Sequence, residues 1–387
     1  MVAGVPVAKT HTDQALRFPF LDLKAQFRGI REEVIQAVER VLEGQSFILG
    51  DEVSTLEREL ACLLQCEFAV GCASGSDALL LSLMALDVRP GEEVITTPLT
   101  FVATAGSIAR LGARPKFVDI DPLTFNLDPQ QLQHAISSRT RAVIPVHLFG
   151  LAADLQPILR IAGQESLAVI EDAAQAICAR YGGRPVGSLG ALGCFSFFPS
   201  KNLGGAGDGG LITTANPEFA DKLKILRVHG SRKKYEYLMV GVNSRLDALQ
   251  AAILRVKLRY LNSWTEDRRR NAQRYGVLFR EYDLASQVQV PVSPENCYHV
   301  FNQYTVRVER RDQLQQYLRS RGIPTEIYYP EPLHLQPAFS YLGYRRGDFP
   351  EAESACRQVL SLPVYPEITE PQQRAVVENI AAFYRAD

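Results

Sequence analysis

The sequence has almost no excess of charge of either sign. It contains 42 Lys and Arg residues against 43 Asp and Glu residues, which gives a formal net charge of −1 at pH 7. A near-neutral chain offers no electrostatic reason to expect a nucleic acid or an anionic membrane as its partner. The basic run 268–270 follows acidic residues and is typical of the mixed-charge face of a helix.

Long apolar runs, tandem repeats and low-complexity segments are also missing. No apolar stretch approaches the ~20 residues that a membrane-spanning helix needs. Residues 1–10 lack the charged start and the long apolar stretch of a signal peptide. We therefore expect a cytoplasmic protein whose partners are neither membranes nor nucleic acids.

The seven cysteines are scattered along the chain. Cys62 and Cys66 stand four apart within a helical pattern, and no second pair has the spacing of metal ligands. Such thiols are typical of buried free cysteines in a reducing compartment. The sequence therefore predicts no metal site.

At 387 residues the chain is long for one compact domain. From about residue 20 to 215, short β-branched runs alternate with helical patterns, as is typical of an α/β protein with a mostly parallel sheet flanked by helices. We expect a tail at 1–19, a large α/β domain at 20–254 and a small C-terminal α+β domain at 255–387. The runs predicted as strands are 68–71, 93–96, 116–119, 142–146, 167–170 and 194–198.

Helical patterns with a period near 3.6 residues accompany these strands. They predict helices at 31–42, 53–64, 77–86 and 101–111, and one long helix over 245–285. Further on, the pattern predicts a strand at 303–308, a helix at 311–321 and a mainly helical tail at 349–385 that is broken at 362–366.

A lysine, Lys201, stands between an aromatic predicted strand and a glycine-rich segment. Within that segment Gly205, Gly207 and Gly210 satisfy G-x-G-x-x-G, but a dinucleotide site needs a helix after the motif and a β-prone segment follows. Glycines also leave room beside a flat ligand. An amine shielded from water there has a lowered pKa and is available as a nucleophile toward a carbonyl cofactor. A simply solvated loop lysine is the alternative.

An acid, Asp172, ends a run that is predicted as a buried strand. Ligands of open α/β sheets bind outside the carboxyl ends of the strands. Asp172 either caps the next helix or keeps the pyridine nitrogen of a bound pyridoxal 5′-phosphate (PLP) protonated.

Two further turns lie at predicted strand ends. The turn at 74–76 precedes a predicted helix, and a helix N-terminus with adjacent hydroxyls suits a phosphate group. An ordinary N-cap by Ser76 or Asp77 is the alternative there. Phe101 begins the helix predicted at 101–111 and either stacks on a planar cofactor or belongs to the core.

Taken in order, these segments resemble the nucleotide-sugar aminotransferase family, the DegT- or StrS-type branch of fold-type I PLP enzymes. The resemblance runs from about residue 20 to 366, nearly the full length. It implies the fold-type I aminotransferase architecture, PLP as cofactor, and a homodimer with shared active sites. Its most specific blocks are 73–79, 145–150, 171–176, 196–204 and 241–252.

The resemblance also implies functions for single residues. Lys201 matches the lysine that forms a Schiff base with PLP and later moves protons, and Asp172 matches the partner of the pyridinium nitrogen. The other cofactor-binding positions that it implies are Gln175 near the phenolic oxygen, Phe101 as the stacking ring, Gly75, Ser76 and Ser196 around the phosphate, and Asn243 reaching the phosphate of the neighbouring subunit.

Three positions match regions of the family that approach the nucleotide-sugar, namely Arg245, Tyr329 and His334. A structural salt bridge explains Arg245 equally well, and a packed histidine explains His334 equally well. His147 falls within a family block, and we interpret it first as a structural residue.

The reaction that the resemblance implies is transamination, with glutamate as the amino donor and a nucleotide-linked keto-sugar as the acceptor. The stretch 228–237 is most similar to members that aminate C3 of dTDP-linked 3-keto-6-deoxyhexoses. Three alternatives remain: C4 amination of a UDP- or GDP-linked 4-keto sugar, amination or dehydration of a carbocyclic ketone, and a non-catalytic PLP-binding regulator. Lys201 argues against the branch that removes a sugar hydroxyl, because that branch carries histidine at this position.

Overall fold

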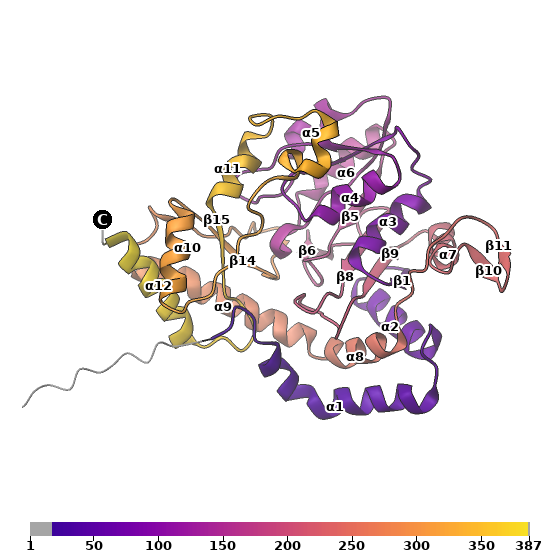
Figure 1. Cartoon of the computed structure of the whole chain (residues 1–387), viewed down its shortest axis with the longest axis horizontal. Coiled ribbons are helices and arrows are strands. Elements are labelled where there is room, and N and C mark those ends of the chain that lie inside the picture. The colour runs from indigo at the N-terminus through magenta and orange to yellow at the C-terminus, as the bar shows by residue number, and fades with distance from the viewer. Residues whose placement is uncertain (1–17, 386–387) are drawn as a thin grey trace, which may run out of the picture.

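The computed structural model describes residues 18–385, so the predicted tail at 1–19 lies outside the described residues except for its last two positions. Figure 1 shows a sheet covered by helices, with α12 (Glu370–Arg385) at one end of the molecule and the hairpin β10–β11 (Ser231–Lys233 and Glu236–Tyr237) projecting from the other. Within 18–385, no helix combines the length and apolarity that a bilayer crossing requires.

A seven-stranded sheet forms the centre of the large part of the chain. Its strands are β1 Phe68–Cys72, β2 Glu93–Thr96, β3 Arg114–Phe117, β4 Thr140–Val143, β5 Ala168–Asp172, β8 Leu192–Ser196 and β9 Gly210–Thr214. They are arranged in the order β1-β9-β8-β5-β4-β2-β3. The strands from β8 to β3 run parallel, whereas β9 is antiparallel to both β8 and β1. The mostly parallel sheet that the sequence predicts is therefore confirmed.

Successive side chains of each strand point to opposite faces, and helices cover both faces. In β5, Ile170 packs with Leu79 and Leu223 on one face, and Val169 packs with Ile158 on the other. Burial on both sides explains why these strands are near-continuous apolar runs in the sequence. The helices are α3 Gly75–Ala85, α4 Val102–Arg110 and α7 Pro217–Leu226 on the first face, and α2 Gly50–Leu63, α5 Pro129–Ala135, α6 Leu155–Gln164 and α8 Ala248–Leu258 on the second.

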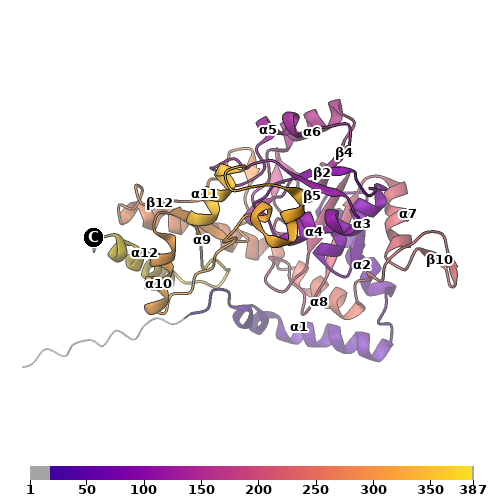
Figure 2. The same ribbon diagram turned by 45° about the horizontal axis from the view of Figure 1, so that its top comes forward.

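The long helix α1 (Leu23–Gly44) lies against α8, and the two run side by side in Figures 1 and 2. It begins after Asp22, whose side chain accepts a hydrogen bond from the Ala25 N–H at 2.8 Å. This is the arrangement expected of an N-cap aspartate. Its buried face contains Ile30, Val34 and Val41.

The single helix predicted over 245–285 is wrong. The structure has two helices there, α8 and α9 (Leu261–Glu281), separated by a turn at Arg259 and Tyr260. The apolar side of α8 packs against α1 and α2, whereas that of α9 packs against a separate C-terminal core. One straight helix cannot direct its apolar stripe toward both partners, so the chain turns between them.

The C-terminal core is built on a three-stranded antiparallel sheet of β12 (Val288–Gln289), β14 (Tyr304–Val308) and β15 (Val359–Leu362). Helices α9, α10 (Arg311–Ser320) and α12 cover it, and Tyr275 is buried at its centre. The strand predicted at 303–308 and the helix predicted at 311–321 are confirmed by β14 and α10. The remaining elements are α11 Pro350–Gln358, the short strands β6 Arg180–Tyr181, β7 Arg184–Pro185 and β13 Cys297–Tyr298, and 3-10 turns at Leu148–Gly150, Leu333–Leu335 and Pro337–Leu342.

The predicted domain boundary between residues 254 and 255 falls within α8. Because α9 contributes to the C-terminal core and α8 does not, we propose that the small domain begins at the turn between these helices. Part of the C-terminal segment returns to the large sheet, where Leu333, Phe339 and Phe349 pack with Leu99 and Phe117.

Candidate active site

A pocket of about 480 Å³ lies at the carboxyl ends of β5 and β8. This is where parallel α/β sheets place their ligands, because the loops that follow the strands meet there. The pocket brings together most of the site residues predicted from the sequence, namely Gly75, Ser76, Phe101, Asp172, Gln175, Ser196, Lys201 and Tyr329.

The carboxylate of Asp172 lies at the end of β5 and is only 5% exposed. Burial raises its pKa, and this effect is partly offset by a hydrogen bond from Thr104 and by the nearby charge of Lys201. The Thr104 hydroxyl lies 2.8 Å from Oδ2, and the Ala174 N–H donates to Oδ1 at 3.2 Å. Both carboxylate oxygens are therefore held by hydrogen bonds.

The amine of Lys201 lies in the loop that follows β8 and lines the same pocket. The surrounding protein removes water from its ammonium group and lowers the pKa of Lys201 to about 8, although the carboxylate of Asp172 acts in the opposite direction. A neutral, nucleophilic amine is therefore available at mildly alkaline pH. The alternative of a simply solvated lysine does not fit this position.

The N-terminus of α3 and the end of β8 approach each other very closely. A Cβ atom on Gly75 would lie 2.7 Å from Cβ of Ser196, and one on Gly210 would lie 2.3 Å from the carbonyl oxygen of Ser74. Only glycine permits this approach, and it places the Ser196 hydroxyl beside the N–H groups of the helix terminus. The N-cap itself is Ser74, whose side chain accepts from the Asp77 N–H at 3.1 Å, so a cap by Ser76 or Asp77 is wrong.

Gln175, which follows β5, connects the large sheet to the C-terminal segment. Its Oε1 accepts from the Phe149 N–H at 2.7 Å, and its Nε2 donates to the hydroxyl of Tyr329 at 3.3 Å. The Tyr329 ring lies 6.2 Å from the ring of Phe101. Phe101 is 55% exposed and lines the pocket, so its face remains accessible to a planar ligand.

Three predicted site residues lie outside the pocket. Asn243 is exposed and Arg245 is partly exposed, and their functions stay predictions. His334 is 2% exposed, which favours the alternative of a packed histidine, and its contact with the nucleotide-sugar stays a prediction. Its Nε2 lies 3.1 Å from Glu353, and its ring packs against Phe349.

The structure also places residues in the pocket that the sequence did not indicate. Thr100 and Thr104 come from the start of α4, and Gln303 and Tyr328 come from the C-terminal part of the chain. The spacing of the threonines, four apart beside Phe101, is a local pattern that places both on one side of the helix start, but it does not by itself indicate a pocket. The C-terminal residues reach the pocket only through tertiary packing.

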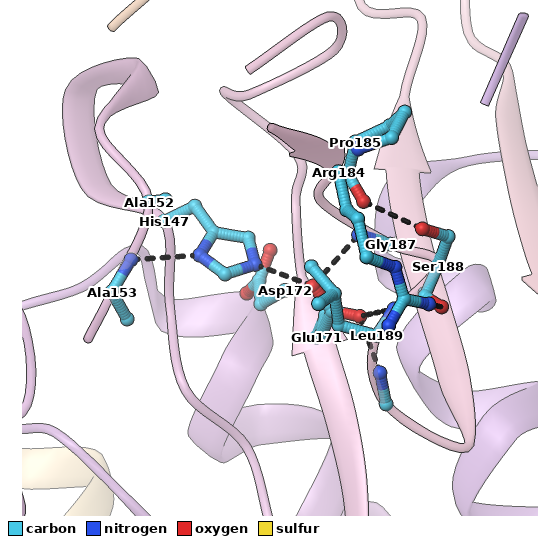
Figure 3. A network of polar contacts seen from close by, with 12 residues as sticks. His147, Ala152, Ala153, Glu171, Asp172, Arg184, Pro185, Gly187, Ser188 and Leu189 are labelled. Atoms are coloured by element: carbon cyan, nitrogen blue, oxygen red, sulfur yellow. Dashed lines mark hydrogen bonds and ion pairs between the residues drawn. The ribbon is translucent and has the colours of Figure 1, made fainter. Parts of the chain in front are cut away.

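A second buried network adjoins Asp172 and is drawn in Figure 3. Nδ1 of His147 accepts from the Ala153 N–H at 3.0 Å, so the ring proton is on Nε2, which donates to Glu171 at 3.0 Å. Burial would raise the pKa of Glu171, but hydrogen bonds from His147 and from the N–H groups of Gly187 and Gly190 hold it below its ordinary value. His147 is fully buried, and the interpretation of it as a structural residue is confirmed.

This network also fixes the end of β5. The backbone N–H of His147 donates to the carbonyl oxygen of Asp172 at 3.0 Å, and the Asp172 N–H donates to Pro145 at 2.9 Å. Glu171 in turn accepts from the Leu189 N–H at 2.7 Å. On the β8 side, the Ala173 N–H donates to the Cys194 carbonyl oxygen at 2.8 Å, so the backbone around Asp172 is held from both sides.

The residues of the pocket fit the functional groups of PLP. An amine of lowered pKa suits the aldehyde, a buried carboxylate suits the ring nitrogen, and an exposed aromatic face suits the pyridine ring. The helix terminus beside Ser196, which a Cβ at position 75 would fill, suits the phosphate.

Comparison with known proteins identifies the family. Residues 28–381 match the model of the DegT/DnrJ/EryC1/StrS aminotransferase family, and the chain belongs to this family of PLP-dependent sugar aminotransferases. The fold agrees, because the structure of DesV from S. venezuelae superimposes with a TM-score of 0.91 and 42% identity, over 95% of this chain and 98% of that chain.

Three related proteins align with nearly the whole chain. The "pleiotropic regulatory protein" of Geobacillus stearothermophilus is 51% identical over 96% of this chain and 99% of its own length. The "UDP-N-acetyl-3-dehydro-alpha-D-glucosamine 3-aminotranferase" of Acidithiobacillus ferrooxidans is 44% identical over 93% and 96%. The "dTDP-3-amino-3,4,6-trideoxy-alpha-D-glucose transaminase" of Streptomyces venezuelae is 43% identical over 94% and 95%.

The buried pair of His147 and Glu171 leads to a prediction about stability. Each oxygen of Glu171 accepts from two donors, and Glu171→Gln turns one of these oxygens into an NH₂ group that faces its two donors. We expect the free energy of unfolding to fall by about 2–4 kcal/mol at pH 7. Urea denaturation measures this loss. Glu165→Gln, at an exposed carboxylate, should stay within about 0.5 kcal/mol of the parent.

The loss should depend on pH. Because the folded protein lowers the pKa of Glu171, its contribution to stability is complete above the unfolded pKa of about 4.3 and disappears as the pH falls through the folded value. The difference between the two proteins should therefore shrink in acid. A loss that grows as the pH falls would contradict the assigned network.

Proposed function

We propose that the protein transfers an amino group to C3 of a nucleotide-linked 3-keto sugar, with glutamate as the donor. The observation that carries the reaction is the placement of the Lys201 amine and the Asp172 carboxylate in one pocket. The position of amination is supported by two relatives, named for UDP- and dTDP-linked sugars, that share C3 although their nucleotides differ. The donor and a cytoplasmic location stay predictions.

The substrate that we favour is a dTDP-linked 3-keto-6-deoxyhexose. Its support is the segment 228–237, which forms the exposed hairpin β10–β11 and resembles the corresponding segment of C3-aminating enzymes. C4 amination of a UDP- or GDP-linked 4-keto sugar requires the same residues around the cofactor and is the main alternative. A carbocyclic ketone is the other catalytic alternative.

A regulator is favoured by one specific observation, the name of the relative that is 51% identical. Against a purely regulatory protein stands the pocket itself. A sensor needs to bind PLP, but it does not need an amine of lowered pKa and a carboxylate directed at the same ligand. We therefore rank catalysis first.

Asp172 has the central electrostatic task in the mechanism. When bound, PLP supplies an electron sink for the electrons of a C–H bond that loses its proton. The carboxylate of Asp172 would hold the proton on the ring nitrogen, and its burial would make the attraction between the two charges strong. Gln175, whose Oε1 accepts from the Phe149 N–H, would lie near the phenolic oxygen.

Lys201 has two tasks. Its neutral amine would hold PLP through the aldehyde carbon until the amino donor took its place. The freed amine then takes the proton from the α-carbon of glutamate and, in the second half of the reaction, returns a proton to C3 of the sugar. Proton transfer by a positioned group of this kind contributes roughly 10²–10⁴ in rate.

The remaining residues bind and orient. Gly75, Ser76 and Ser196 line the pocket and would hold the phosphate, and Phe101 would cover one face of the ring. Tyr329, whose hydroxyl accepts from Gln175, would contact the sugar. Asn243 and Arg245 are exposed or partly exposed outside the pocket of their own chain, and we infer that they complete the site of a second subunit in a homodimer.

The covalent step is tested first. Borohydride should reduce the linkage between PLP and the wild-type protein, so that the reduced PLP group stays attached to Lys201 as a label. The Lys201→Ala variant should carry no such label. Transamination from glutamate should fall by about 10²–10⁴ in that variant. Absorption spectra and peptide mass spectrometry measure both.

The matched control is Lys257, whose pKa burial also lowers to about 8 but which lies on α8 and donates to the Gly204 carbonyl at 2.6 Å. A label on Lys257, or normal turnover by Lys201→Ala, would contradict the function given to Lys201.

A panel of ketones tests the acceptor. We expect the highest kcat/KM for a dTDP-linked 3-keto-6-deoxy sugar and values about 10²-fold lower for 4-keto sugars and an inosose. In these other acceptors the carbonyl carbon is displaced from the amino group that has to react with it. The half-reaction with glutamate alone serves as the control, since it is independent of the acceptor. Preference for the inosose would select the carbocyclic alternative, and PLP binding without transamination of any ketone would select the regulator.

Mixed dimers test the shared site. Lys201→Ala and Asn243→Asp should each be weak alone, and random re-association of the two should restore roughly a quarter of the activity, because each mixed dimer contains one intact site. Lys201→Ala mixed with Asp172→Asn is the control and should stay inactive, since both changes lie in the same subunit's pocket. Absence of recovery in the first mixture would contradict a shared site.

A further inference from the structure

Behind Asp172, two threonine side chains form a hydrogen-bonded chain that ends on its carboxylate. Oγ1 of Thr104 lies 2.8 Å from Oδ2 of Asp172, and Oγ1 of Thr100 lies 2.9 Å from Oγ1 of Thr104. Both threonines are buried, and the Thr104 side chain is fully so. Thr104 lies in the first turn of α4, and Thr100 directly precedes Phe101, the N-cap residue of this helix.

The direction of this chain follows from the charge of the carboxylate. An ionised carboxylate can only accept hydrogen bonds, so Thr104 donates its single hydroxyl proton to Asp172. The oxygen of Thr104 then accepts the proton of Thr100. Because the Ala174 N–H donates to the other carboxylate oxygen, each oxygen has its own donor and rotation of the group is restricted.

We propose that Thr104, supported by Thr100, is a positioning residue that keeps Asp172 ionised and oriented toward the ring nitrogen of the cofactor. Thr104 acts through Asp172 and does not contact the reacting atoms. The inference rests on the proposed function, which makes Asp172 the partner of that nitrogen. It adds that Asp172 needs the Thr104 hydroxyl to remain ionised, because a buried acid without a charge-assisted donor shifts toward its neutral form.

The other groups that face Asp172 do not replace Thr104. The charge of Lys201 lowers the pKa of Asp172, in the same direction as the hydroxyl, and His147 has a smaller effect of the same sign. Cys194 and Tyr329 also interact with Asp172, but burial raises the pKa of both, so they stay neutral at physiological pH. Burial of the carboxylate is the main effect that raises the pKa of Asp172. Loss of the Thr104 hydroxyl removes one of the groups that counteract it.

Three variants separate positioning from packing. Thr104→Val removes the hydroxyl at nearly constant shape, and Thr104→Ser keeps it. Thr265→Val is the matched control, because Thr265 is 2% exposed and its hydroxyl donates to the Leu261 carbonyl at 2.8 Å within α9, outside the pocket. Each is compared with the wild type by equilibrium dialysis against PLP and by the pH profile of the glutamate half-reaction.

We expect Thr104→Val to bind PLP about 10- to 100-fold more weakly, the range for loss of a hydrogen bond to a charged group. The acid limb of its pH profile should move to higher pH by about one unit. The hydroxyl stabilises the charged carboxylate, so its loss raises the pKa of Asp172. Thr104→Ser should restore both values. Thr265→Val should lower thermal stability without changing either.

If Thr104→Val and Thr265→Val give the same PLP affinity and pH profile, the inference is wrong. If Thr104→Val does not fold, Thr100→Val takes its place as the test. We expect a smaller shift of the acid limb to higher pH in that variant, and the absence of any shift would overturn the inference. Wild-type protein that forms no borohydride-stable link to Lys201 would overturn the proposed function together with this inference. A normal link in the wild type with unchanged variants would overturn the inference alone.

Discussion

A single buried carboxylate, that of Asp172, sets the requirements for the structure around it. Removing an ionised carboxylate from water is costly unless donors replace the lost hydration. The chain meets this cost with the Ala174 N–H, the Thr104 hydroxyl and the charge of Lys201. The residual effect of burial still raises the pKa of Asp172, which makes its state sensitive to every neighbour.

The rest of the fold explains why this carboxylate does not move. β5 lies between β4 and β8 near the middle of the sheet, and its end is fixed by backbone hydrogen bonds from both sides. Beside it, Glu171 and His147 anchor the turn at Gly187 and Gly190 (Figure 3). A site on rigid elements holds its reacting groups more closely than a site on loops.

The glycines of the lysine loop serve packing and not a dinucleotide. Gly210 begins β9, and its missing side chain lets this strand approach Ser74 at the start of α3. On the other side, Gln250 and Lys257 of α8 bind the backbone of Ala206 and Gly204. The loop that carries Lys201 is thus held between the sheet and α8.

The sequence predicts the parts of this arrangement that depend on local pattern. Buried parallel strands appear as apolar runs, and side chains at their carboxyl ends must meet, so Asp172 and Lys201 were predicted to share a site. The family resemblance added Gln175, Phe101 and the phosphate-binding positions. The turn between α8 and α9 was missed, because a helical pattern does not reveal that two successive helices serve different cores.

Other features that the sequence does not reveal have a similar cause. His334 lies in a segment that approaches the pocket, but the partner that buries it, Glu353, is contributed by α11 and is not visible in the local sequence. Thr104 is ordinary in sequence, and its importance depends on a contact with a residue 68 positions away. Two-residue strands such as β6 and β13 carry too few residues for a periodic signal.

The most direct measurement is a crystal structure of the protein with PLP. We predict that Nζ of Lys201 is bonded to the former aldehyde carbon, and that a carboxylate oxygen of Asp172 lies within about 2.7–2.9 Å of the ring nitrogen at the opposite side of the same ring. A cofactor whose ring nitrogen faces another residue, or whose aldehyde lies beyond the reach of Lys201, would contradict this prediction.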